Sequence, residues 1–96
     1  MGNTQILYTR RFSDLGALQE PHILQYALIN DTDGALPYGV AITGLYAGRQ
    51  ETQSCRAISH SAEKACRVLL YLYENAVEPC AAAGVVENIR RSGAMA

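Results

Sequence analysis

The sequence carries almost no net charge and contains no long apolar run. Eight basic and nine acidic residues give a formal net charge of −1 at pH 7. This balance provides no bulk electrostatic attraction to nucleic acid or to an acidic membrane surface. The longest apolar run is far shorter than a membrane-spanning helix requires. We therefore expect no membrane segment and no nucleic-acid partner.

The cysteines are few and odd in number, which excludes a complete internal disulfide framework. Cys55, Cys66 and Cys80 cannot all pair within one chain. With His22 and His60 they offer ligand types that zinc prefers, but no Cys-x-x-Cys or His-x-x-x-His spacing is present. No positively charged and then apolar leader opens the sequence. These features predict free thiols in a reducing cytoplasm, with no bound metal or cofactor.

The composition is typical of a folded globular protein. Apolar residues make up 49% of the chain and charged residues 18%, unlike a disordered sequence. A chain of 96 residues suffices for one core and not two. We expect a single domain over residues 1–96, with frayed ends at 1–4 and 92–96.

The first half of the chain predicts short β-strands. Segments rich in β-formers are separated by turn residues at 13–21 and 31–34 and by Ala47-Gly48, and they cover residues 5–12, 22–30, 38–46 and 49–58. A single helical turn is possible at 15–19. The segment 22–30 is apolar on both faces, which predicts either cover on both sides or burial of one side in a dimer.

A two-residue loop at Ala47-Gly48 fixes the register of the predicted hairpin. Val40 then faces Cys55, Tyr38 faces Ala57, and Thr43 faces Thr52. Gly39 falls within the strand, where glycine indicates a bulge or a close approach of another backbone.

The second half predicts two helices that cover the sheet. Residues 59–75 carry an apolar stripe at steps of three and four, formed by Ala65, Val68, Leu69, Leu72 and Ala76. Ser59 or Ser61 is the expected N-cap, and Asn75 the expected left-handed C-terminal residue. A shorter helix follows at 79–91. The predicted fold class is α+β, a three- to four-stranded antiparallel meander with one long and one short helix on one face.

One pair of side chains, Cys55 and His60, offers the residue types of a nucleophilic site. Cys55 and His60 lie five residues apart, and a histidine activates a thiol when the two are in contact. Cys55 falls on the predicted core face, where a thiol behaves as a small apolar group. Two arginine pairs, Arg10-Arg11 and Arg90-Arg91, form a phosphate- or carboxylate-binding patch if the chain ends meet.

Four short motifs in order give the chain a resemblance to a known family. They are Tyr38-Gly39-Val40-Ala41-Ile42, Ile58-Ser59-His60-Ser61-Ala62-Glu63-Lys64-Ala65, Asn75-Ala76-Val77-Glu78-Pro79 and Val85-Val86-Glu87-Asn88. Over about half its length the chain thus resembles a family of short proteins from Gram-positive spore-forming bacteria, a domain of unknown function. The resemblance implies a small cytoplasmic domain with a sheet followed by helices, and it implies no activity.

The sequence favours a non-enzymatic function. No polar constellation converges on a site, one strand is apolar on both faces, and an open sheet has free edges. We expect an interaction or regulatory module that self-associates, most simply as a dimer. The alternative is a small thiol-dependent or ligand-binding protein that uses Cys55 and His60.

Overall fold

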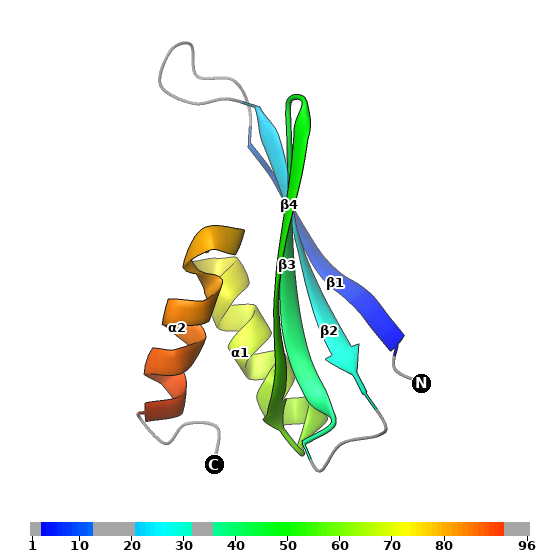
Figure 1. Cartoon of the computed structure of the whole chain (residues 1–96), viewed down its shortest axis with the longest axis vertical. Helices are drawn as coiled ribbons and strands as arrows, with labels where there is room; N and C mark the ends of the chain where they lie inside the picture. The colour runs from blue at the N-terminus through cyan, green and yellow to red at the C-terminus, as the bar shows by residue number, and fades with distance from the viewer. Residues whose placement is uncertain (1–2, 13–20, 32–35, 92–96) are drawn as a thin grey trace.

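A four-stranded antiparallel sheet carries two helices on one of its faces (Figure 1). The computed structural model describes residues 3–12, 21–31 and 36–91. Neighbouring strands follow one another along the chain, so the sheet is a simple meander with β1 and β4 at its edges. The predicted α+β fold is confirmed. Its elements are β1 (Asn3–Phe12), β2 (His22–Asn30), β3 (Tyr38–Tyr46), β4 (Arg49–Ser59), α1 (Ala62–Glu74) and α2 (Pro79–Arg91).

Some expected segments differ from the observed ones at their ends. β1 begins at Asn3, inside the segment 1–4 for which fraying is expected. The possible helical turn at 15–19, most of the turn at 31–34 and the C-terminal residues 92–96 lie outside the described residues.

The two helices are equal in length, whereas the sequence suggested a long one and a short one. Each has 13 residues. α1 begins later than expected because Ser59 still belongs to β4, and its buried hydroxyl accepts a hydrogen bond from the Ser61 N–H at 3.0 Å. Ser61 is then the N-cap, and its hydroxyl accepts from the Lys64 N–H at 3.3 Å.

The C-terminal end of α1 also differs from the expectation. Asn75 has φ −98° and is not left-handed; its side-chain amide donates to the Tyr71 carbonyl at 2.8 Å. The left-handed residue is Ala76, with φ 49°. The N–H of Val77 then donates to the Leu72 carbonyl at 3.0 Å, which closes the helix end.

The predicted β3–β4 register is confirmed over most of its length. Tyr46 pairs with Arg49, and Val40 pairs with Cys55. Beyond Cys55 the prediction is wrong, because Tyr38 pairs with Ser59 and not with Ala57. β4 holds two extra residues there, and Ala57 takes a left-handed φ of 58°. This bulge redirects the chain toward α1.

Gly39 is required at the bulge, as its position in the strand suggested. A Cβ at Gly39 would lie 2.5 Å from the Cys55 carbonyl oxygen and 2.9 Å from the Arg56 Cα. Both neighbours are backbone atoms, which cannot move aside without distorting the sheet.

The main core lies between the sheet and the helices. The predicted apolar stripe of α1 is confirmed, since Val68, Leu69 and Leu72 are all buried. Each of these side chains contributes roughly 1.5–3 kcal/mol to the free energy of folding. The buried cluster comprises Leu24, Tyr26, Val40, Ile42, Ile58, Ala65, Val68, Leu69, Leu72, Val77, Ala82 and Val86.

β1 holds the C-terminal end of α1 through aromatic and cationic contacts. The Tyr8 and Tyr73 rings stack with their centroids 4.8 Å apart. The Arg10 guanidinium donates to the Tyr73 carbonyl at 3.2 Å and lies 5.5 Å from the centre of its ring. α1 has no basic residue in its own last turn, so Arg10 supplies the positive charge that a helix C-terminus favours.

Candidate functional site

Cys55 lies on β4 with its side chain toward the helices. It is half-buried, opposite Val40, and packs against the main core. Burial raises the pKa of the Cys55 thiol above its usual value, because the charged thiolate is poorly solvated there. Raising the pKa reduces the fraction of reactive thiolate at neutral pH. The position therefore suits a packing role.

His60 lies just beyond the end of β4, five residues after Cys55. It is exposed, in the bend that joins β4 to α1. The strand from Cys55 to Ser59 advances by up to about 13 Å before His60 is reached. Cys66 on α1 is half-buried and Cys80 at the start of α2 is exposed. Among the described residues, no three histidine, cysteine or acidic side chains gather as a metal site.

Arg10 and the pair Arg90-Arg91 lie at different ends of the helical layer. Arg10 contacts Tyr73 at the C-terminal end of α1. Arg90 and Arg91 lie at the C-terminal end of α2, beside the N-terminal end of α1 (Figure 1). The chain thus does not bring the two pairs into a common patch.

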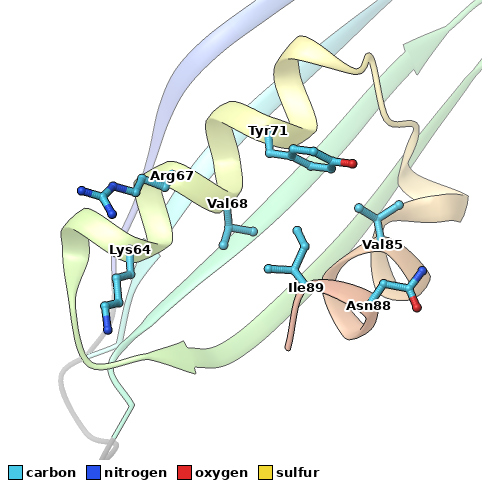
Figure 2. Close-up of a pocket in the computed structure, with 7 residues that line it drawn as sticks. All are labelled: Lys64, Arg67, Val68, Tyr71, Val85, Asn88 and Ile89. Carbon is cyan, nitrogen blue, oxygen red and sulfur yellow. The ribbon is translucent and has the colours of Figure 1, made fainter. Parts of the chain in front are cut away.

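A groove of about 530 Å³ runs between α1 and α2 (Figure 2). It forms because the helices run antiparallel over the sheet and present side chains at helical spacing to the gap between them. Val68, Val85 and Ile89 form its apolar floor, and Tyr71, which is 49% exposed, forms part of its wall. The remaining lining residues are Lys64, Arg67 and Asn88.

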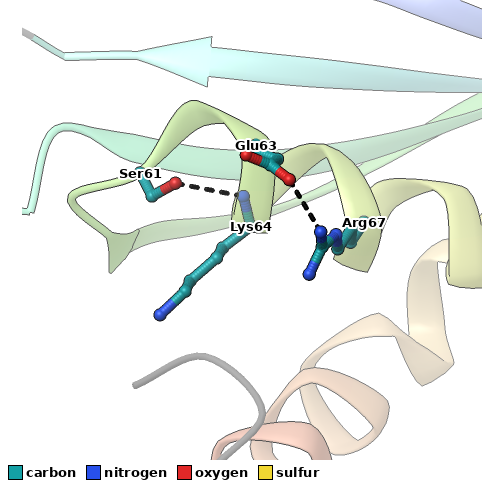
Figure 3. Close-up of polar contacts among 4 residues, drawn as sticks. All are labelled: Ser61, Glu63, Lys64 and Arg67. Carbon is teal, nitrogen blue, oxygen red and sulfur yellow. Dashed lines mark hydrogen bonds and ion pairs between the residues drawn. The ribbon is translucent and has the colours of Figure 1, made fainter.

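Charged side chains lie at one end of the groove. Lys64 and Arg67 project from the first two turns of α1, and Arg67 pairs with Glu63 at 2.6 Å (Figure 3). At the neighbouring end of α2, Glu87 pairs with Arg90 at 3.9 Å and Arg91 at 3.6 Å. Among the described residues at this end, Arg67, Arg90 and Arg91 each lie beside a glutamate.

A second candidate surface is the sheet face away from the helices, here called the uncovered face. No described helix or strand lies over it (Figure 1). Its centre is a small apolar cluster of Ala27, Ile29 and Ala41, and all three side chains are buried within the single chain. Strand alternation and pairing add Ile6, Ile23 and Leu45 around that cluster, with hydroxyl side chains at Thr9, Thr43, Thr52 and Ser54.

Few charged side chains of the four strands lie on the uncovered face. Arg11, opposite Ile23, stands at one end of the strands. Arg56 stands at the other end, where it pairs with Asp31 at 3.9 Å. Thr43 and Thr52 share a hydrogen bond of 3.1 Å, as expected for this cross-strand pair.

Both free sheet edges carry features that discourage pairing with another strand. β1 has a bulge between Ile6 and Tyr8. β4 has the bulge near Ala57 and an exposed pair of Arg49 and Glu51 at 3.8 Å. Bulges and charges are common ways to protect edges.

Two tyrosines of the sheet donate hydrogen bonds to Val77 and Glu78, which link α1 to α2. Sequence patterns did not indicate this role. The Tyr26 hydroxyl donates to the Val77 carbonyl at 3.1 Å, and burial raises the pKa of Tyr26 to about 12. The Tyr46 hydroxyl donates to a Glu78 carboxylate oxygen at 3.2 Å. Burial, with the neighbouring Glu78 charge, raises the pKa of Tyr46 to about 12. These contacts fix where α2 begins.

A family of unknown function, DUF6514, matches the chain over residues 8–92. The chain belongs to DUF6514. The match includes nearly all of the described fold, so DUF6514 corresponds to the whole arrangement of a meander and two helices. The expected membership in a family of unknown function is confirmed. No curated protein and no solved structure matches this DUF6514 chain. Neither described helix is long and apolar enough to cross a membrane.

Sequence reasoning did not identify the groove. One signal was available: Lys64, Arg67, Val68 and Tyr71 follow the i, i+3, i+4, i+7 spacing of a helix face. This face lies beside the buried stripe and includes its Val68. The second wall comes from α2, and only the antiparallel placement of the helices shows that the two faces meet.

Proposed function

We propose that this protein is a non-enzymatic interaction module that self-associates through the uncovered face. The observation that carries the proposal concerns β2, which is apolar on both sides. The helices cover the side with Leu24 and Tyr26, while Ala27 and Ile29 lie on the uncovered face. A second copy would cover the other side. We also place the module in the reducing cytoplasm, where its three cysteines stay free.

The chemistry of the uncovered face suits a second copy of the same surface. Its hydroxyl groups both donate and accept hydrogen bonds, so a two-fold arrangement can pair them. The centre is built from small residues, Ala27 and Ala41, next to Ile6, which is 52% exposed. Ile6 of one copy can therefore contribute apolar surface to the contact with the other.

The size of the face predicts a weak dimer. Four strands about 4.8 Å apart and about 30 Å long give roughly 600 Å² per copy. A total of about 1,200 Å² lies at the low end of specific interfaces. Because the edges are protected, the two sheets would pack face to face at about 10 Å. We expect a dissociation constant on the order of 10–100 µM.

Sedimentation equilibrium at concentrations from about 1 to 500 µM tests the proposal. The wild type should change from monomer to dimer over this range. Ile6→Glu should weaken dimerisation by about tenfold or more, because it places a charge in the interface. The matched control is Leu70→Glu on α1, where the side chain is 38% exposed and lies off the uncovered face. A monomer at every concentration, or equal dimerisation of both variants, would refute the proposal.

A further inference from the structure

We infer that two copies of the chain pair about a two-fold axis that runs along the strands, over the line between β2 and β3 on the uncovered face (Figure 1). The inference rests on the proposed self-association and adds the orientation of the second copy, with the side chains that determine it. The observation behind it is the order of side chains across the sheet, which is nearly symmetric about the line between β2 and β3.

Strand pairing arranges the uncovered face in rows that cross all four strands from β1 to β4. The first row has polar ends and an apolar centre, the second is polar throughout, and the third has small residues at its centre. In this order the rows are Arg11, Ile23, Leu45 and Gln50; Thr9, Gln25, Thr43 and Thr52; and Ile6, Ala27, Ala41 and Ser54. In every row the two inner side chains are therefore of one kind, and in the first two rows the outer ones match as well.

The symmetry of the rows makes the face complementary to a second copy of itself. A two-fold rotation about the axis keeps each row at its own level and exchanges β1 with β4 and β2 with β3. Thr9 then faces Thr52 of the second copy, and each hydroxyl can donate to the other or accept from it. Ile23 faces Leu45, so the apolar centre of the first row meets an apolar centre.

The position of Arg11 agrees with the same axis. The rotation places Arg11 on β1 opposite Gln50 on β4 of the second copy, and the amide oxygen of glutamine can accept from a guanidinium. The two copies of Arg11 lie at opposite edges of the dimer, three strand spacings or about 14 Å apart. This separation exceeds the Debye length of about 8 Å at 0.15 M salt, so their repulsion is largely screened.

An axis that crosses the strands would pair the side chains less well. It would also align the two sheets, but it would reverse the order of the rows, so that β1 faces β1. With the row of Thr9 on this axis, Arg11 would face Ile6 of the second copy. A guanidinium would then lie against an apolar side chain that offers no acceptor, which is unfavourable. The order of side chains therefore favours the axis along the strands.

A charge-swap series followed by sedimentation equilibrium tests the inference. Thr9→Glu and Thr52→Lys each place an unpaired charge in the interface and should each raise the dissociation constant by about tenfold. In the double variant Thr9→Glu/Thr52→Lys, each new carboxylate faces a new ammonium of the second copy. Its dissociation constant should return to within about threefold of the wild-type value. Both positions are exposed, and circular dichroism confirms folding.

The recovery in the double variant can come only from contact between copies. Thr9 lies on β1 and Thr52 on β4, at the two edges of one sheet and about 14 Å apart, beyond the Debye length at 0.15 M salt. The matched control is an equimolar mixture of the Thr9→Glu and Thr9→Lys proteins. About an axis across the strands these two charges would meet and restore a mixed dimer. About the axis along the strands each faces Thr52, so the mixture should associate as weakly as its components.

The outcomes separate the orientation of the dimer from its existence. Recovery in the mixture and not in the double variant would overturn the inference and leave self-association through the uncovered face in place. A double variant as weak as the single variants, in a protein that Ile6→Glu also weakens, would do the same. Single variants that dimerise like the wild type would remove the face from the interface. A wild type that stays monomeric at every concentration would refute the proposed self-association and the inference with it.

Discussion

The two faces of the sheet are built from the same strands, but they differ in the size and burial of their side chains. On the helix-facing side Leu24, Tyr26 and Ile42 are large and completely shielded. On the uncovered face the central residues Ala27 and Ala41 are small, Ile29 beside them is buried, and Ile6 on β1 is 52% exposed. Large side chains gather where the chain supplies its own cover. Small ones lie at the centre of the uncovered face, so side-chain size along one strand differs between the two faces.

The largest expected effect comes from placing a charge under α1. Leu69→Asp buries a carboxylate at a fully shielded position and should cost about 4 kcal/mol or more, which abolishes cooperative thermal unfolding. Leu70→Asp changes the next residue, which is exposed, and should cost less than about 1 kcal/mol. Melting curves followed by circular dichroism check both. A normal transition for Leu69→Asp would show that the helix-facing side is not the core.

A smaller effect on stability is expected at Gly39, where β3 approaches the bulge in β4. Gly39→Ala brings a Cβ against the Cys55 carbonyl and should destabilise the fold by about 1–3 kcal/mol. Gly84→Ala is the matched control, because a Cβ there meets nothing and α2 gains up to about 1 kcal/mol of helix propensity. Urea denaturation of both variants makes the comparison. Equal stability of the two would mean that the strands do not approach at Gly39.

The sequence predicted the fold largely because its patterns are local. The stripe on α1 and the Ala47-Gly48 hairpin need only helical and strand periodicity, and both were found where expected. The exchange of Ala57 for Ser59 as the partner of Tyr38 was not predictable, since a bulge depends on how the chain must turn to reach α1.

The candidate sites were less predictable than the fold because they depend on tertiary packing and not on local patterns. The apolar character of β2 on both sides was visible in the sequence, and it led to the expectation of cover or a dimer. Which side the helices take depends on tertiary packing. The groove needs residues from two helices whose relative placement no local pattern contains, and Arg10 reaches Tyr73 across 63 positions of the chain.

A modest pH effect on stability is expected from the buried Tyr26. The pKa of Tyr26 is raised from 10.0 to about 12, so the folded state holds its proton where the unfolded state has lost it. The stabilisation is complete below pH 10 and is lost as the pH rises through 12. Tyr26→Phe should reduce this alkaline loss.

Urea denaturation at several pH values between about 8 and 12 measures the slope of unfolding free energy against pH. Tyr46 also has a pKa raised to about 12, so the Tyr26→Phe variant should keep part of the slope and the Tyr26→Phe/Tyr46→Phe double variant should keep less. An unchanged slope in the double variant would mean that neither hydroxyl is shielded by the helices and their link.

The smallest expected effect on the fold concerns the alkylation of the thiols, which also tests the thiol-dependent alternative function. Cys55 lies on the covered side, with burial raising its pKa, while Cys80 is exposed at the start of α2. Iodoacetamide at neutral pH should therefore modify Cys80 first and Cys55 last, as followed by mass spectrometry of the intact and digested protein. Cys55→Ser should leave the alkylation rate of Cys80 unchanged.

The opposite order would reopen the thiol-dependent alternative. If Cys55 reacts fastest and His60→Ala slows it, the two side chains must meet in solution and the histidine must lower the thiol pKa. The helix-facing side of the sheet would then have a chemical role as well as a packing role. Slow modification of Cys55, unaffected by His60→Ala, would instead agree with a packing role for Cys55 and argue against the thiol-dependent alternative, because a shielded thiol forms little thiolate.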